Sequence, residues 1–365
     1  MKKILFSATI TDHFYYFHLP YLKLFHDMGW EVHVASHGDR ELPYCDVHHE
    51  IPISRSPFSK SNFEAYKQLK KVIDNNNFDL IHCHTPMGGL LTRLAANKKN
   101  SGSVIYTAHG FHFYKGASLM NWLIYYPIEL FMSFRTDCLI TINGEDYAFA
   151  QKHFKHPEVK LVDGVGYNES RFFPVDSEEK KSLRAKFGYG EDEKILIYVA
   201  EMNENKNQSM LIRALKKITD ARLIIAGADN YGGRYVFQAK ALEVDDRVEF
   251  LGHCENVEEL VKLSDICAAS SLREGLPVNI MESMACGLPV VAVDNRGHRA
   301  LINDGEDGFL VRANDFNTMA EKVNLLLADK EMYRSFSQSA AENIKRFSQR
   351  NVVSQMSEIY GNFQR

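Results

Sequence analysis

The sequence predicts an α/β protein of two doubly wound, Rossmann-like domains that face each other across a cleft. Short apolar runs of strand length alternate with longer segments in which apolar residues recur every three or four positions. This alternation indicates parallel strands joined by helices. Two such series occur within the 365 residues, a length that suits two domains. Ligands of such sheets bind beyond the carboxyl ends of the strands, so functional residues are expected in the loops after strands.

The first series contains six expected strands. They are the apolar runs at residues 2–8, 31–36, 79–84, 103–108, 138–142 and 159–163. Residues 62–76, between the second and the third strand, have the apolar spacing of a helix. Strands buried on both faces read as continuous apolar runs, so we expect helices on both sides of this sheet.

The second series contains six further expected strands. They are the runs at residues 194–200, 221–227, 247–252, 266–270, 289–293 and 308–311. Residues 206–220 show helical spacing after the first of these strands. Glycines, a proline and a charged run punctuate the stretch between the two series, and the linker is placed near residues 163–185. The expected domains are residues 1–168 and 169–349.

Charge and composition exclude several classes of protein. The 43 basic and 47 acidic side chains leave a formal charge of -4, which argues against a polycationic nucleic-acid binder. With 45% hydrophobic and 25% charged residues, the chain has the composition of a globular protein rather than a disordered or fibrous one. Thirteen of the fifteen histidines lie in the first 170 residues. Most of them are expected to be surface residues, and none is expected to bind a metal.

The expected location is the cytoplasm. The six cysteines form no CxxC pair and several lie in apolar runs, as expected of buried free thiols in a reducing compartment. The first residues form a short apolar run without a cleavage site, so they are interpreted as a strand rather than a signal peptide. The most apolar stretch, residues 119–134, is interrupted by Asn121, Pro127 and Glu129 and is too short to span a bilayer.

Residues 271–311 carry the strongest functional signal. They begin after an expected strand, and Pro277 suits the first turn of a helix that should run to Ala285. The unpaired amides of that turn, at the positive end of the helix dipole, favour an anion such as a phosphate. Glu282 lies one turn deeper, where a carboxylate can accept hydrogen bonds from the vicinal hydroxyls of a ribose. Glu274, in the loop, would face the group beyond the phosphate.

This segment resembles the retaining glycosyltransferases of family 4, which have the GT-B fold. The family hallmark is E-x7-E within an EG-[LF]-P unit, and Glu274 and Glu282 match it, followed by ACGLPVVA and DGEDGFLV in the expected order. The resemblance implies transfer of a sugar from a nucleotide diphosphate donor. It also implies that Glu274, Gly275, Leu276 and Pro277 orient the donor sugar and diphosphate while Glu282 holds the ribose.

The resemblance extends to the basic residue that stabilises the leaving diphosphate. Lys206 occupies the family's lysine position, between a strand and a helix, where its charge can neutralise a departing diphosphate. Most members also have a Gly-Arg pair a few residues earlier, but Ala200 and Glu201 stand there in this chain. The sequence leaves open whether Lys206, backbone amides or Arg273 neutralises the diphosphate in place of that arginine.

The first half resembles a subgroup of the family that assembles bacterial exopolysaccharide and capsule. His109 directly follows an expected strand, where the family places a histidine against the donor sugar. His84, at another strand end, and His13, in the loop after the first strand, are weaker candidates for the acceptor side. The acceptor implied by the resemblance is a saccharide on a polyprenyl diphosphate at the inner leaflet of the membrane.

Two further expectations follow from the resemblance. The loop containing Cys254 is the family's contact with the nucleotide base, and a C-terminal helix near 350–365 would pack back on the first domain. A third expectation concerns a membrane patch, since the acceptor is lipid-linked and aromatic residues with flanking cations gather in one segment. The residues of this patch would be Trp122, Tyr125, Tyr126, Phe131, Phe134, Lys115 and Arg135.

Missing motifs narrow the chemistry. The sequence has no GxGxxG after a strand, no GxxxxGK[ST] and no HExxH. These absences argue against a dinucleotide dehydrogenase, a P-loop nucleoside triphosphatase and an HExxH zinc protease. A DxD triplet for a divalent ion is also lacking, so no metal or other cofactor is expected. The expected enzyme is a hexosyl- or N-acetylhexosaminyltransferase that uses a UDP-sugar. Two alternatives stay open: a nucleotide-sugar epimerase on the same scaffold, and a non-catalytic subunit that binds a sugar nucleotide.

Overall fold

The computed structural model describes residues 1–96 and 101–364. It divides into two compact units, Met1–Val165 with Arg350–Arg365 and Gly166–Gln349. Each unit has one parallel sheet with helices between its strands, so the predicted α/β class with two Rossmann-like domains is confirmed.

The sheet of the first unit has seven strands in the order β3-β2-β1-β4-β5-β6-β7, and all neighbours are parallel. The strands are β1 (Lys3–Ile10), β2 (Glu31–His37), β3 (Val47–Glu50), β4 (Leu80–His84), β5 (Ser103–Ala108), β6 (Cys138–Thr141) and β7 (Glu158–Leu161). The six predicted strands of this half are all present. The prediction missed β3, because this partly exposed edge strand consists of VHHE and has no apolar run.

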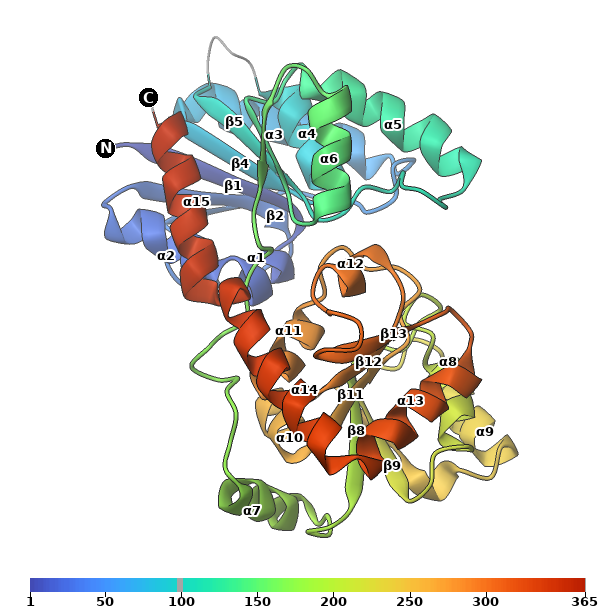
Figure 1. Ribbon diagram of the computed structural model, residues 1–365. Coiled ribbons are helices and arrows are strands. Elements are labelled where there is room, and N and C mark those ends of the chain that lie inside the picture. The colour runs from blue at the N-terminus through green and yellow to red at the C-terminus, as the bar shows by residue number, and fades with distance from the viewer. Residues whose placement is uncertain (97–100, 365) are drawn as a thin grey trace. The chain divides into compact units, whose positions relative to one another are not determined.

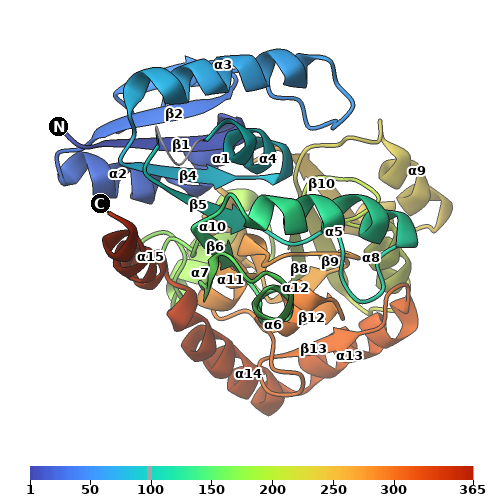
Figure 2. The same ribbon diagram turned by 90° about the horizontal axis from the view of Figure 1, so that it is seen from above.

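Helices cover both faces of this sheet. They are α1 (Asp12–Phe17), α2 (Leu19–Asp27), α3 (Ser61–Asn76), α4 (Pro86–Ala95), α5 (Leu119–Ser133), α6 (Gly144–His153) and α15 (Gln349–Phe363). Figure 2 shows α2 and α3 on opposite sides of β1 and β2. Along β1, Phe6 packs with residues of α1, α2 and α15, while its neighbour Leu5 packs with residues of α3 and α4. This alternation explains why every residue of β1 from Ile4 to Thr9 is buried.

The C-terminal helix α15 belongs to the first unit (Figure 1). Val352, Met356, Ile359 and Tyr360 are buried in the core cluster that contains β1 and β2. Burial of each such side chain contributes about 1.5–3 kcal/mol. The Tyr360 hydroxyl also lies 2.7 Å from Nδ1 of His82 in β4. The helix therefore completes one face of the first sheet, and residue 365, where the predicted helix ends, lies outside the described residues.

The sheet of the second unit has six parallel strands in the order β10-β9-β8-β11-β12-β13. They are β8 (Lys194–Val199), β9 (Ala221–Ala226), β10 (Val248–Gly252), β11 (Ile266–Ala269), β12 (Val290–Val293) and β13 (Gly308–Val311), as predicted. The α-helices are α7 (Ser177–Phe187), α8 (Gln208–Leu215), α9 (Arg234–Ala241), α10 (Val257–Leu263), α11 (Val278–Ala285), α12 (Arg296–Arg299), α13 (Phe316–Ala328) and α14 (Lys330–Asn343). Short 3-10 turns at Asp245–Arg247 and Ile344–Phe347 complete the unit.

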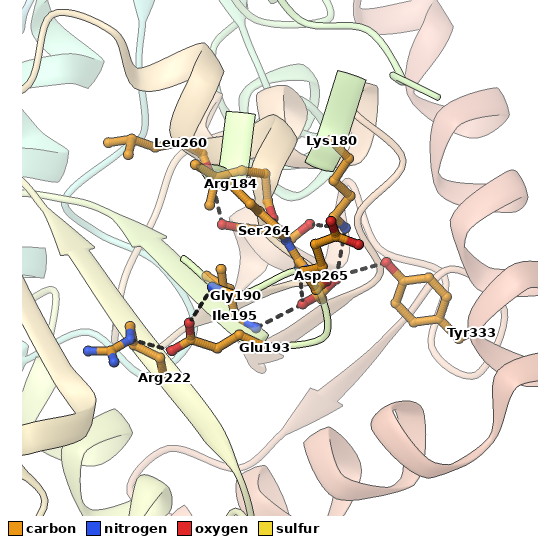
Figure 3. A network of polar contacts seen from close by, with 12 residues as sticks. Lys180, Arg184, Gly190, Glu193, Ile195, Arg222, Leu260, Ser264, Asp265 and Tyr333 are labelled. Carbon is orange, nitrogen blue, oxygen red and sulfur yellow. Dashed lines mark hydrogen bonds and ion pairs between the residues drawn. The ribbon is translucent and has the colours of Figure 1, made fainter. Parts of the chain in front are cut away.

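A polar network around Asp265 fastens α7 to this sheet (Figure 3). The Asp265 carboxylate accepts two hydrogen bonds from Arg184 Nη2, at 2.8 and 2.9 Å, and one from Lys180 Nζ at 2.8 Å. It also accepts the Ile195 amide of β8, and the Tyr333 hydroxyl of α14 donates to the Asp265 carbonyl. Because both cations converge on one carboxylate with little solvent around it, this network is a structural anchor.

Both sheets reverse their strand order at one point. In the first sheet the reversal falls between β1 and β4, and in the second between β8 and β11. The loops that leave adjacent strands at such a point run in opposite directions and leave a crevice at the carboxyl ends, where ligands of open α/β sheets bind. Each unit thus has one favoured place for a ligand site.

The apolar stretch at residues 119–134 forms α5, and its exposed face differs from the predicted membrane patch. Trp122, Tyr125 and Tyr126 are only partly exposed and pack on the core cluster that contains Phe111 and Phe113. The exposed apolar side chains of this segment are Leu119, Met120, Leu123, Ile124, Phe131 and Phe134. Of the predicted aromatic residues, only the last two are on the exposed face. Within the described residues, no helix is long and apolar enough to cross a bilayer.

Candidate active site

The candidate site of the second unit is built from three loops at the carboxyl ends of β8, β11 and β12. Hydrogen bonds to backbone carbonyls hold these loops together. Asn205 Nδ2 donates to the Arg273 carbonyl at 2.9 Å, and the Leu272 amide donates to the Asn205 carbonyl at 2.7 Å. Asn295 Nδ2 donates to the Ser271 carbonyl at 2.9 Å. The three loops therefore hold their side chains in fixed positions relative to one another.

Lys206 and Glu274 meet across these loops. The Lys206 ammonium nitrogen lies 2.6 Å from Glu274 Oε1, and the two side chains are 21% and 14% exposed. The Lys206 carbonyl accepts a hydrogen bond from Ser270 Oγ at 2.7 Å, which fixes the backbone from which the lysine projects. The pair is partly shielded from solvent, so its attraction is less screened than that of a surface ion pair.

Helix α12 supports Glu274 from the other side. The Asn295 side chain caps this helix by accepting the Gly297 amide at 3.0 Å and the His298 amide at 3.1 Å. A Cβ atom on Gly297 would lie 2.7 Å from the Glu274 Cβ and 3.0 Å from its carbonyl carbon. Only a glycine lets α12 approach Glu274 this closely. The sequence analysis did not identify this position, since the contact joins two loops that are 23 residues apart.

Helix α11 begins at Val278, one residue later than predicted, with Pro277 at its N-cap. Pro277 makes no side-chain cap hydrogen bond, and no other side chain in the described part of the chain is recorded as capping the first-turn amides. Asn279 of that turn donates from Nδ2 to the Val199 carbonyl at the end of β8, at 2.9 Å. The uncapped end of α11 is therefore held at the strand-order reversal, next to the loop that contains Glu274. Leu276 is buried and Gly275 partly exposed in that loop.

Glu282 lies deeper in α11 and is partly exposed. Burial raises the pKa of its carboxyl to about 8, the nearby Arg171 cation acts in the opposite direction, and Glu258 raises it further. Arg171 Nη2 donates to Glu258 Oε2 at 2.6 Å, so the cation close to Glu282 is already paired. Among the described residues, none donates a hydrogen bond to the Glu282 carboxylate. A carboxyl group without a partner is suited to receive the hydroxyls of a ligand.

Glu201 stands where most members of the family have an arginine. Glu201 is exposed, and its Oε2 accepts a hydrogen bond from Asn230 Nδ2 at 2.8 Å. Arg273 is exposed in the loop before Glu274. The structure thus places an acidic residue where the family has a basic one. Two cations contact Glu274: Lys206 Nζ donates to its Oε1 at 2.6 Å, and Arg296 Nε donates to its carbonyl at 3.3 Å.

Cys254 lies apart from the Lys206–Glu274 pair. It is partly exposed in the loop after β10 and lines a cavity of about 330 Å³ with Phe187, Tyr189 and Leu260, among others. Neither Lys206 nor Glu274 lines that cavity. The loop leads into α10 (Val257–Leu263), whose Glu258 acts on the pKa of Glu282.

The three histidines predicted in the first half come together at the other reversal point. His13 lies in α1, His84 ends β4 and His109 follows β5. His84 Nδ1 is 3.3 Å from His109 Nε2, and the ring centroids of His13 and His109 are 4.9 Å apart. A fourth histidine, His18, between α1 and α2, joins them, with its Nε2 at 3.0 Å from His13 Nε2. The sequence analysis missed His18 because it follows no strand.

The histidines are less exposed than expected of surface residues, because six are partly exposed and five are buried. Among the fifteen, only four are exposed: His26, His37, His156 and His253. Burial lowers the pKa of His109 to about 4 and that of His82 to about 3, and it holds the pKa values of His13, His18 and His84 well below the ordinary range. These imidazoles are therefore neutral near pH 7.

Comparison with known proteins assigns both units. A model of the glycosyl transferases group 1 matches residues 179–343, and a model of the glycosyl transferase 4-like family matches residues 3–143. The EpsD protein of Bacillus subtilis (strain 168), which carries the name of a glycosyltransferase, is 48% identical over 98% of this chain and 96% of its own length. The chain belongs to the GT-B glycosyltransferases.

Two further comparisons extend this assignment. The chain is 28% identical to the UDP-Gal:alpha-D-GlcNAc-diphosphoundecaprenol alpha-1,3-galactosyltransferase of Escherichia coli, over 74% of this chain and 71% of that protein. Its fold resembles that of the sucrose-phosphate synthase from Thermosynechococcus elongatus, with a TM-score of 0.84, 20% identity and 99% of each chain covered. The predicted family is therefore confirmed, and the protein is a glycosyltransferase enzyme.

Within this glycosyltransferase, the predicted site residues form two groups. Lys206, Glu274 and the start of α11 adjoin one another in the second unit, with Glu282 one turn deeper. His13, His84 and His109 form the other group, in the first unit. Gly297 and His18 are the residues that the structure adds to these groups. Both could be recognised only from packing between segments that are distant in sequence.

Proposed function

We propose that this glycosyltransferase moves a hexosyl or N-acetylhexosaminyl group from a UDP-sugar to a lipid-linked saccharide, with retention of anomeric configuration. The observation that carries the proposal is the Lys206–Glu274 pair beside the uncapped start of α11. A cation, free helix amides and an oriented carboxylate at one strand-order reversal are the groups that a nucleotide diphosphate sugar requires.

Each group has a separate part in donor binding. The Lys206 ammonium and the first-turn amides of α11 stabilise the negative charge that develops on the departing diphosphate. Glu274, with the backbone at Gly275, orients the sugar, and Glu282 accepts the ribose hydroxyls. His109 is the residue proposed to contact the donor sugar, since a neutral imidazole can both donate and accept a hydrogen bond. His13 and His84 belong to the acceptor side in this proposal.

Retention follows from a same-face displacement. The bond between the anomeric carbon and the diphosphate oxygen breaks as the acceptor oxygen forms its bond on the same face. The acceptor hydroxyl gives its proton to an oxygen of the departing diphosphate. The positive charge that Lys206 and the α11 amides supply to the leaving group makes a divalent ion unnecessary for transfer. We therefore propose that the transfer step requires no metal or other cofactor.

The acceptor is proposed to be a saccharide on a polyprenyl diphosphate, as the name of the Escherichia coli relative states for that protein. The exposed apolar face of α5 supports a peripheral location at the inner leaflet of the membrane. Leu119, Leu123 and Phe131 are 74%, 64% and 57% exposed on it. Such a face binds the interface by burying apolar side chains among the lipid head groups and acyl chains.

The α5 helix is held firmly enough to present such a face. Glu129 in α5 pairs with Arg93 in α4 through two hydrogen bonds of 2.9 and 3.1 Å, and the Arg93 guanidinium stacks 3.8 Å from the Tyr106 ring centroid. Arg93 is buried, and the Glu129 carboxylate raises the pKa of its guanidinium against the effect of burial. Moving α5 away from α4 would leave the Arg93 charge buried without its partner, which is costly. The pair therefore fixes α5 to the first unit.

A donor screen tests the proposed reaction. The purified chain is incubated with a panel of UDP-, GDP- and ADP-sugars and a synthetic polyprenyl diphosphate saccharide, and release of nucleoside diphosphate is measured without and with a chelator. The expected result is UDP release that depends on acceptor and withstands the chelator. NMR of the product then reads its anomeric configuration. An inverted product contradicts retention.

The two alternatives give different results in the same screen. A nucleotide-sugar epimerase would convert the donor to an isomer in the absence of acceptor, without releasing the diphosphate. A non-catalytic binding subunit would bind a donor but show neither transfer nor slow donor hydrolysis. Acceptor-dependent release therefore excludes both alternatives at once.

A further inference from the structure

The four-histidine cluster, His13, His18, His84 and His109, has the composition of a metal site. One nitrogen from each ring lies within 4.8 Å of a nitrogen of every other ring. The four residues come from α1, the turn before α2, the end of β4 and the residue after β5, so the backbone brings them together from distant parts of the sequence. The cluster also borders the first core, where the Phe14 ring contacts His18 and His84.

The spacing of the nitrogens fits tetrahedral coordination. Zinc binds imidazole nitrogen at 2.0–2.1 Å, so two nitrogens in a tetrahedral site lie about 3.3 Å apart. Two pairs in the cluster already have this spacing, His13 Nε2 with His18 Nε2 at 3.0 Å and His84 Nδ1 with His109 Nε2 at 3.3 Å. The six distances between ring centroids are 4.1, 4.7, 4.9, 5.5, 5.5 and 5.7 Å. All four rings therefore lie close together, and three of them, His18, His84 and His109, line one small cavity.

Two buried ring nitrogens of the cluster make no hydrogen bond within the described residues. His18 Nδ1 and His84 Nε2 are buried and have no hydrogen-bond partner among the described residues. A cavity of about 10 Å³ is lined by His18, His84 and His109, with Tyr21 and Thr107 among its other walls. This volume is about that of one water molecule or one ion. Because each ring offers only one nitrogen to an ion, these two unpaired nitrogens are alternative ligand atoms to His18 Nε2 and His84 Nδ1, which form the close pairs.

The chemistry of the four side chains indicates which ions the cluster can bind. All four ligands are imidazoles, and each offers one nitrogen. The group contains no carboxylate, which makes it a poor match for the oxygen-preferring ions Mg²⁺ and Ca²⁺. Imidazole alone suits zinc and its neighbours in the first transition row.

We propose that His13, His18, His84 and His109 bind one Zn²⁺ ion per chain through neutral imidazole nitrogens. The ion takes no part in the transfer step, for which Lys206 and the α11 amides supply the charge. Binding instead withdraws His109 from the donor sugar, so metal occupancy lowers donor affinity. This last consequence rests on the proposed function, whereas the metal site itself does not.

Direct binding tests the site without any activity measurement. The full chain, without a polyhistidine tag and stripped with a chelator, is titrated with Zn²⁺ in equilibrium dialysis and with Co²⁺ in visible absorption. The expected result is one Zn²⁺ per chain and the intense visible bands of tetrahedral Co²⁺, removed by one equivalent of Zn²⁺. Less than 0.1 equivalent bound at a tenfold metal excess, or an octahedral Co²⁺ spectrum, overturns the proposal.

Variants distinguish this cluster from the other histidines. His13→Gln and His109→Gln change partly exposed members and should weaken Zn²⁺ binding at least about tenfold. His49→Gln is the matched control, because His49 forms a separate imidazole pair with His33 at 2.9 Å. It should leave binding unchanged. Equal weakening in the control and the cluster variants contradicts the assignment. Circular dichroism confirms folding, and the wild-type Co²⁺ spectrum decides the question should a variant fail to fold.

Donor titration separates the metal site from its proposed consequence. Stoichiometric Zn²⁺ binding with unchanged donor affinity would retain the metal site and refute the role of His109 at the donor sugar. Reduced donor affinity in wild type, with no further reduction by Zn²⁺ in His109→Gln, is the expected result.

Discussion

Lys206 and Glu274 form an ion pair of 2.6 Å between the loops that follow β8 and β11, the two strands at which the second sheet reverses its order. Their contact means that the cation proposed for the diphosphate is held by the carboxylate proposed for the sugar. A donor that inserts its diphosphate beside Lys206 would therefore reorient Glu274 as well. The two residues should act as one unit in catalysis, and their substitutions should not be additive.

Lys206→Ala tests the leaving-group role. Loss of one oxyanion stabiliser costs on the order of 100- to 1000-fold in turnover, and we expect at least a tenfold fall in kcat in a folded variant. Lys206→Ala combined with Glu274→Ala should lose less than the product of the two single losses. Steady-state release of nucleoside diphosphate measures each variant, and near-normal turnover in Lys206→Ala refutes the role.

Gly297→Ala tests the support of Glu274 by α12. The added methyl would lie 2.7 Å from the Glu274 Cβ and must displace it. Misplacement of a catalytic group by about 1 Å can cost about 100-fold, so we expect kcat to fall about 10- to 100-fold. Gly361→Ala is the matched control, since a Cβ there meets nothing within 4 Å. Equal activity of both variants would contradict the positioning role.

The raised pKa of Glu282 predicts that the stability of the protein depends on pH. Its pKa in the folded protein is about 8, above the ordinary value of about 4.3, so the folded state holds the proton more tightly than the unfolded state does. Stability from this group is full below about pH 4 and is lost as the pH rises towards 8. In Glu282→Gln, the free energy of unfolding in urea should fall less between pH 5 and pH 8.5, by at least about 1 kcal/mol. Parallel profiles would show that the folded-state pKa is ordinary.

Asp265→Ala tests the anchor of α7. The substitution leaves Lys180 and Arg184 without the carboxylate that pairs with both, and breaking a largely buried pair costs about 3–5 kcal/mol. Glu259→Ala is the control, because it removes only the exposed pair with Lys186, which is worth about 1 kcal/mol or less. Urea unfolding of the second unit measures both. A smaller loss in Asp265→Ala than in the control would contradict the assignment.

The exposed face of α5 predicts membrane binding. Replacing Leu123 and Phe131 with serine removes two exposed apolar side chains and should release most of the protein in liposome flotation. Phe63→Ser is the control, since Phe63 is 66% exposed on α3 and not on α5. The liposomes contain anionic lipid at physiological salt. Unchanged partitioning of the folded double variant would contradict membrane binding through α5.

Much of the fold could be predicted because buried parallel strands impose a local signature. All twelve predicted strands are present, and those in the middle of each sheet are apolar runs buried between two layers of helices. The prediction missed the edge strand β3, because its partial exposure leaves its sequence polar. Glu274, Glu282 and Lys206 could be proposed because they follow strands or start helices, and those positions converge in any doubly wound sheet.

The exposed side of a helix could not be predicted in the same way. In α5, apolar residues occur almost all round, so the sequence does not distinguish the rings that pack on Phe113 from those that face solvent. The choice depends on which neighbouring segments cover the helix. The predicted patch therefore combined Trp122 and Tyr126, which pack inward, with Phe131 and Phe134, which are exposed.

By itself the sequence determined the two parallel sheets, the family and the positions of the residues that follow strands, because these depend on local apolar periodicity and on motif spacing. Only the tertiary structure decided which side chains share a site. The excess of histidines in the first half was a compositional fact until folding placed His13, His18, His84 and His109 within 4.8 Å of one another. Likewise, Gly297 acquires a role only because α12 packs against Glu274. Both are contacts between distant segments, which the order of strands in a sheet creates and local sequence does not encode.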